Sequence, residues 1–314
     1  MAKDNPLSAE HLFEHVQDAT YWHLPRFLAP ASGQHGDGHG GHHAGHVNIP
    51  QFRPDTPIWE MDSGSRTLDQ FFTPLDFQIT KFMIIELIVA VIVAILFIAL
   101  ASRIRYGGVP KGRLWNMLEV FFEFIRDQVA KPAIGEHDAN RFLPFLLTLF
   151  FFILGCNLAG MIPWMGSPTG AMATTAALAL VTFGVTVGAG IKELGPVGFL
   201  KAQVPHMELP GLLKVVLVPM IFVIELLGLM IKHAVLAVRL LANMMAGHIV
   251  LAVIIGFISA AAIGGGAWMA TGVAPVSALA AVALSLLELF VAFLQAYVFV
   301  FLAALFIGAA VHPH

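Results

Sequence analysis

The chain has 314 residues, of which 58% are hydrophobic and 12% charged, with a mean hydropathy of +0.80 and a formal net charge of −3. A soluble globular protein has about 25% charged residues, so this chain has too little polar surface for a water-soluble body. The composition therefore predicts an integral membrane protein. The slightly negative net charge argues against nucleic acid as a partner, and the single Cys156 excludes an internal disulfide.

Residues 1–76 differ from the rest, because they contain no long apolar run and hold most of the histidines. We predict a soluble extension on the outer side of the membrane, with a short amphipathic helix near Ala9–Val16 and no cleaved signal peptide. The tract HGDGHGGHHAGH places five histidines among glycines. They are candidate metal ligands or proton buffers: His35, His39, His42, His43 and His46. A glycine-rich tract cannot pack a core, so we favour a flexible linker and predict no bound metal or other cofactor.

Residues 77–314 are predicted to form the membrane domain, in which the first span covers about 79–102. Basic residues follow this span, which places its end in the cytoplasm and the N-terminus outside. The next stretch, RLWNMLEVFFEFIRDQVAKP, starts at Arg113 and has apolar residues at helical spacing with charges between them. This pattern is typical of an amphipathic helix that lies at the cytoplasmic interface.

Two further spans are expected at about 142–164 and 171–190, with a tight turn at the GSPTG sequence between them. The last part of the chain has two over-long apolar blocks, at about 212–263 and 275–311, separated by a glycine-rich loop. Residues 220–263 as one helix are about 66 Å long, against a hydrocarbon thickness of about 30 Å. No internal turn is visible, so a steeply tilted helix is expected. The predicted fold is an all-α integral membrane protein with about five membrane-embedded helices, including a long tilted antiparallel hairpin, and an interfacial helix.

Polar residues follow a regular spacing on the first long block. Glu225, Lys232 and Arg239 are seven residues apart, which places them on one slowly drifting stripe of a helix, and Asn243 extends it by one turn. Ionisable groups inside a membrane are costly and indicate a functional site. Polar contacts between helices are the alternative explanation, and for Lys232 and for the adjacent His233 both explanations remain open.

Folding the hairpin about residues 268–269 brings the polar residues of the second block to matching depths. His248 then faces Glu288, and Gln295 lies opposite Arg239. Histidine and glutamate suit a proton relay, because their pKa values move readily into a useful range. Arginine does not release its proton, so Arg239 separates two proton paths rather than joining them. No acidic residue of the chain is expected opposite it, so its carboxylate should belong to a partner.

The sequences LLGLMIKHAVLAVRLLANMMAGH and LLELFVAFLQAYVFVFLAALFI resemble subunit a of the F-type ATP synthase membrane sector, as does FFILGCNLAGMIPW. The resemblance covers residues 75–311. It implies that Arg239 is the family's essential arginine, facing a ring of c subunits, with Asn243 and Gln295 as polar neighbours. It also implies that His248 and Glu288 line an outer half-channel, and that Glu225 belongs to an inner half-channel with Lys232 nearby.

The resemblance further implies a non-catalytic, ion-translocating subunit, with the ATP chemistry on other subunits. Its expected partners are the c-subunit ring, b-type peripheral stalk subunits and membrane lipid. A multi-pass protein of the bacterial plasma membrane is expected, with the C-terminus in the cytoplasm; the mitochondrial inner membrane is the alternative. An ion channel or a secondary transporter that uses the same charges is the alternative function, although no internal repeat is visible. The residues do not distinguish protons from sodium ions.

Overall fold

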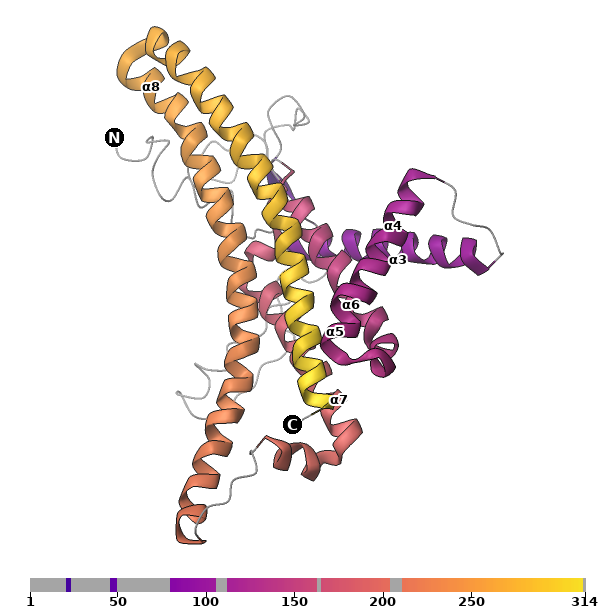
Figure 1. Cartoon of the computed structure of the whole chain (residues 1–314). Coiled ribbons are helices and arrows are strands. Elements are labelled where there is room, and N and C mark those ends of the chain that lie inside the picture. The colour runs from indigo at the N-terminus through magenta and orange to yellow at the C-terminus, as the bar shows by residue number, and fades with distance from the viewer. Residues whose placement is uncertain are drawn as a thin grey trace.

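The structure is a computed structural model (Figure 1). It describes residues 21–23, 46–49, 80–105, 112–162, 165–203 and 211–312, without the side chains of 21–23, 46–48, 103–105, 211–216, 255 and 258–270. The short helix expected near Ala9–Val16 and four of the five histidines of the glycine-rich tract lie outside these residues. Of that tract only the backbone of His46 is described. It belongs to β2 (His46–Asn48), which pairs antiparallel with β1 (Tyr21–His23).

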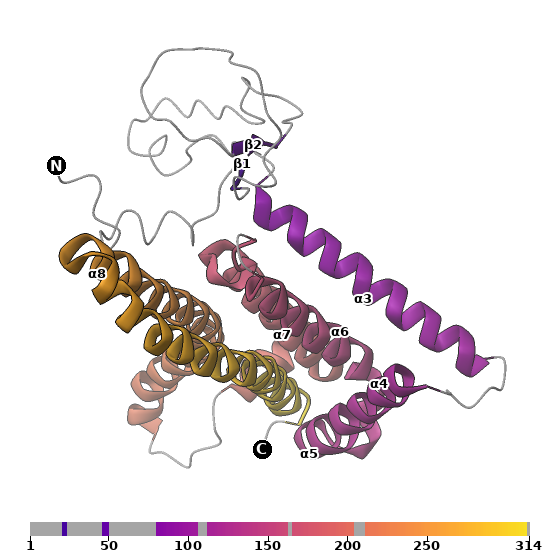
Figure 2. The same cartoon turned by 90° about the horizontal axis from the view of Figure 1, so that it is seen from above.

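Five helical segments are long and apolar enough to cross a membrane in the described part of the chain, which confirms the predicted all-α membrane fold. The first lies in α3 (Lys81–Arg105), and its spanning stretch, Lys81–Ser102, is only 17% buried within the chain. Figure 2 shows α6 and α7 between α3 on one side and the α8 hairpin on the other. The exposed apolar side chains of α3 therefore remain available to lipid or to other subunits.

The predicted amphipathic helix is observed as three consecutive helical pieces. They are α4 (Arg113–Phe124), a π-helical turn η1 (Ile125–Ala130) and α5 (Lys131–Ile134). The apolar stripe expected to face the membrane interface is buried within the protein in its second half, where Ile125 and Val129 are fully buried. On the polar side, hydrogen bonds from Arg126 and Lys131 hold the pKa of Asp127 well below its usual value.

The second and third spans are longer than the sequence predicted. Helix α6 (Glu136–Gly160) begins six residues before the expected position 142, and α7 (Met172–Ala202) continues well past the expected end at 190. The α7 range contains two helices separated by a kink at Gly195, whose φ of 74° and ψ of 164° are not helical. The residue before a proline is disfavoured in the α conformation, so the first helix ends where Pro196 predicts. The expected turn between the two spans contains Gly166 with φ 74° and the short 3₁₀ helix η2 (Pro168–Gly170).

The last two spans are both in α8 (Gly211–Val311), which folds back on itself as a hairpin (Figure 1). Its two spanning segments are Leu217–Ile254, with 38 residues, and Thr271–Val311, with 41. They are about 57 and 62 Å long, roughly twice the hydrocarbon thickness. The chain reverses direction between these two segments, as the sequence predicted, but residues 264–274 are helical and do not form the expected loop. In Figure 1 the axis of α3 lies across that of the hairpin, so both cannot stand along one membrane normal.

The core lies where the second segment of α8 meets α6, η1 and α5. Small side chains dominate the α8 side, since Ala292, Ala296, Ala303 and Ala304 are fully buried. Small residues let helix backbones approach closely in membrane proteins. The closest approach is at Gly308, where a Cβ would lie 2.0 Å from the carbonyl oxygen of Ala133. This packing fixes the second segment of α8 and, through it, the site.

Candidate functional site

The first part of the site is an acid–base pair that bridges the two segments of the hairpin. Nδ1 of His248 lies 3.9 Å from Oε1 of Glu288, and the two side chains are only 16% and 8% exposed. The register predicted from the folded hairpin is therefore observed at this pair. The separation is too long for a direct hydrogen bond, but one water molecule can bridge such a gap.

Gly247 lets the Glu288 carboxyl group lie against the first segment. A Cβ at Gly247 would come within 2.8 Å of Oε1 of Glu288. Oε1 of Glu288 and Nε2 of His248 are both buried, and neither has a hydrogen-bond partner in the described part of the chain. Buried polar atoms are nearly always satisfied, so such atoms are typical of a site that takes up water or a proton.

A buried hydrogen-bond network holds the second segment near this pair. The Asn157 side chain donates to the carbonyl oxygen of Ala292, one turn beyond Glu288, at 3.1 Å. The Thr169 hydroxyl donates to the Asn157 side chain at 2.7 Å, and Ser167 lies within hydrogen-bond distance of Thr169. Sequence reasoning missed these residues, because a lone asparagine in an apolar span carries no spacing signal.

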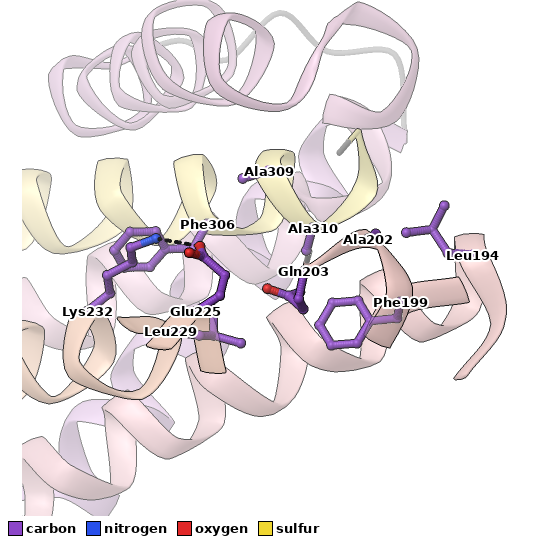
Figure 3. Close-up of a pocket in the computed structure, with 10 residues that line it drawn as sticks. All are labelled: Leu194, Phe199, Ala202, Gln203, Glu225, Leu229, Lys232, Phe306, Ala309 and Ala310. Carbon is purple, nitrogen blue, oxygen red and sulfur yellow. Dashed lines mark ion pairs between the residues drawn. The ribbon is translucent and has the colours of Figure 1, made fainter. Parts of the chain in front are cut away.

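The second part of the site is an ion pair within the first segment. Nζ of Lys232 lies 3.8 Å from Oε1 of Glu225, as the seven-residue spacing predicts. The side chains are 52% and 45% exposed. They border a cavity of about 310 Å³ between the two segments of α8 and the end of α7, shown in Figure 3. Leu229 and Phe306 line it beside the ion pair, and Gln203 faces it from the end of α7.

Arg239 lies between these two pairs along the first segment and is exposed. Among the residues that the structure describes, no acidic side chain lies within ion-pair distance of its guanidinium. By rise per residue, it is about 10 Å from Lys232 and about 14 Å from His248 along the helix axis. An arginine is costly at membrane depth unless it is paired or faces water or a partner.

The other candidate residues occupy distinct positions. Gln295 is buried, Asn243 is partly exposed, and no hydrogen bond joins either to Arg239 in the described part of the chain. His233 is buried and lies next to the Glu225 cavity. The structure describes too little of the N-terminal histidine tract to test it as a metal site, and no cluster of potential metal ligands occurs among the described residues.

Comparison with known proteins assigns the chain to a family. A family model described as ATP synthase A chain matches residues 83–308. The chain belongs to this family. ATP synthase subunit a of Myxococcus xanthus (strain DK1622) is 44% identical over 243 residues, 76% of each chain. That of Anaeromyxobacter sp. (strain Fw109-5) is 33% identical over 312 residues, 96% of this chain and 70% of the relative.

The chain spans less than two thirds of the length of several relatives. It matches 51% of ATP synthase subunit a of Anaeromyxobacter dehalogenans (strain 2CP-1 / ATCC BAA-258), with 44% identity over 209 residues. Membership of the ATP synthase A chain family confirms the resemblance and makes the chain a multi-pass membrane subunit of a larger complex. It favours this over the channel and transporter alternatives.

Proposed function

We propose that the chain is the stator subunit that moves protons through the membrane sector of a bacterial ATP synthase. The observation that carries the proposal is the position of Arg239, exposed on the hairpin between the His248–Glu288 pair and the Glu225–Lys232 pair. In this proposal the first is the outer pair and the second is the inner pair. Neither pair reaches Arg239. A proton therefore cannot pass along this chain alone, and a moving carrier has to bring it past the arginine.

The carrier in this proposal is a ring of c subunits, each with one carboxyl group. A proton enters through His248 and Glu288 and neutralises a ring carboxylate, which can then move into lipid at low cost. After nearly a full rotation, the carboxyl group meets the cavity at Glu225 and releases its proton. Arg239 keeps the facing carboxylate ionised and blocks direct leakage, because a guanidinium does not deprotonate. Gln295 and Asn243 act as its polar neighbours.

The exposed face around Arg239 suits such a ring. Ile231, Val235 and Val238 are about half exposed on the first segment and form an apolar surface around the cation. A ring of mostly apolar helices with one carboxyl group each is complementary to this surface in polarity and charge. We further propose that b-type stalk subunits complete the complex, and that the N-terminus lies outside the plasma membrane and the C-terminus in the cytoplasm.

The test is replacement of Arg239 in the assembled ATP synthase. Arg239→Ala is expected to abolish ATP-driven proton pumping into inverted membrane vesicles. Each proton pumped against 100 mV stores about 2.3 kcal/mol. This energy is lost when protons leak back through the membrane sector. Arg113→Ala, which removes an exposed arginine at the start of α4, serves as the control and should pump normally. Normal pumping by the Arg239→Ala enzyme would refute the proposal.

A further inference from the structure

His233 is a buried histidine that the proton route above does not use. Its side chain lies where three helical segments meet and is 3% exposed. The Phe183 ring of α7 faces it edge-on at a centroid distance of 5.2 Å. The Phe306 ring of the second α8 segment lies at 4.9 Å. Burial among apolar rings is costly for a polar side chain unless its polar atoms form hydrogen bonds. The hydrogen bonding of its two ring nitrogens therefore has to be accounted for.

The backbone determines which ring nitrogen can accept a proton. Nδ1 of His233 lies 2.9 Å from the carbonyl oxygen of Leu229. A carbonyl oxygen only accepts hydrogen bonds, so Nδ1 carries the hydrogen in the neutral ring and Nε2 carries the free lone pair. Nε2 is buried and has no hydrogen-bond partner among the described residues. The ring therefore presents an unsatisfied basic nitrogen inside the protein.

The cavity at Glu225 reaches the immediate surroundings of this ring. Leu229, which holds Nδ1, and Phe306, which packs against the ring, both line the cavity together with Glu225 and Lys232 (Figure 3). Phe183 and Phe306 face His233 from the neighbouring helices, and the charged groups on its own helix at the cavity are Lys232 and Glu225. The His233 ring therefore shares two of its neighbours, Leu229 and Phe306, with the cavity.

We propose that His233 is a proton-accepting station of the inner path, an inference that rests on the function proposed above. It is eight residues from Glu225 and six from Arg239, which are steps of about 12 and 9 Å along the helix. A proton from cavity water binds the Nε2 lone pair and gives an imidazolium whose Nδ1–H still donates to Leu229. The same proton then returns to cavity water, so no other group has to change its bonding.

The experiment uses the assembled complex with two replacements that remove the titration in different ways. His233→Phe keeps a ring between Phe183 and Phe306, whereas His233→Gln keeps a polar side chain. Passive proton conduction is measured in vesicles stripped of the catalytic sector, at varied pH on the Glu225 side. Both variants should conduct several-fold more slowly and lose the dependence on pH between about 5 and 8. His137→Phe, whose side chain is fully exposed at the start of α6, should behave as the parent.

A second measurement tests the proposal if His233→Phe and His233→Gln fail to assemble. His233→Cys should make conduction sensitive to Ag⁺ added from the Glu225 side. The parent should be insensitive, because its single cysteine, Cys156, is buried and is not among the residues that line the cavity. Normal conduction with an unchanged pH profile in His233→Phe would overturn the inference, as would insensitivity of His233→Cys to Ag⁺. If Arg239→Ala abolishes pumping while His233→Phe is normal, only the role of His233 fails.

Discussion

The two acid–base pairs of the hairpin have nearly the same separation but very different surroundings. The nitrogen–oxygen distance is 3.9 Å for His248–Glu288 and 3.8 Å for Lys232–Glu225. The first pair joins the two segments and is at most 16% exposed, whereas the second lies within one segment and is about half exposed. Solvent therefore reaches the second pair more readily and can replace a lost partner there. Exposed ion pairs contribute little to stability, whereas a buried charge that loses its partner is strongly unfavourable.

This difference bears on how each pair would handle a proton. The buried pair has few alternatives to its own two side chains, so each of them should be essential. The exposed pair borders a cavity of about 310 Å³, where water can carry a proton past a missing side chain. We therefore expect the outer pair to be sensitive to substitution and the inner pair to be tolerant.

The largest effect is expected for Glu288→Gln. The amide keeps the size of the side chain but cannot exchange a proton, and the loss of a positioned acid–base group slows proton transfer by about 100-fold. The measurement is passive proton conduction through the membrane sector. Glu136→Gln, an exposed carboxylate at the start of α6, is the control. Normal conduction in Glu288→Gln would remove the outer pair from the path.

A smaller effect is expected for Gly247→Ala. The new methyl group would lie 2.8 Å from Oε1 of Glu288 and displace a carboxyl group, not the backbone. Conduction should therefore fall several-fold while the complex assembles normally. Gly228→Ala, on the same segment, is the matched control, because a Cβ at Gly228 would have no neighbouring atom within 4 Å. Equal conduction in the two variants would show that the exact position of the carboxyl group is unimportant.

The sequence predicted the features that depend on spacing. The Glu225–Lys232 contact follows from two helical turns, and the His248–Glu288 contact follows from the symmetry of a hairpin. The five spanning helices follow from apolar length alone. In each case the distance between residues along the chain translates directly into a position in space.

Features that depend on tertiary packing were not predictable in this way. A second short helix follows the kink at Gly195 within α7, although a proline such as Pro196 usually indicates the end of helical structure. The apolar stripe of α4 and η1 suited lipid and protein equally well, and burial of Ile125 against neighbouring helices was decided by their arrangement. The cavity beside Glu225 depends on Gln203 and Phe306, which are far from Glu225 in the sequence.

On the inner side, Glu225→Gln is expected to slow conduction by only a few-fold. The carboxyl group is lost, but the cavity beside it remains open to water. The rate of proton release, measured at varied pH on the Glu225 side, should still reach a maximum. This maximum should be lower than that of the parent. A loss as large as that of Glu288→Gln would show that the inner cavity has no parallel route, and the contrast between the two pairs would then be wrong.

The smallest effect is expected for Lys232→Gln. An ion pair with both side chains about half exposed contributes about 0–1 kcal/mol, so its removal should change conduction by less than about fivefold. Thermal stability of the complex should not change measurably, because water solvates the Glu225 carboxylate once the ammonium is gone. Lys192→Gln, an exposed lysine on α7, is the control. If Lys232→Gln instead unfolds the complex or abolishes conduction, then the ammonium has a second partner in the assembled enzyme, and the acidic group of a neighbouring subunit is the place to look for it.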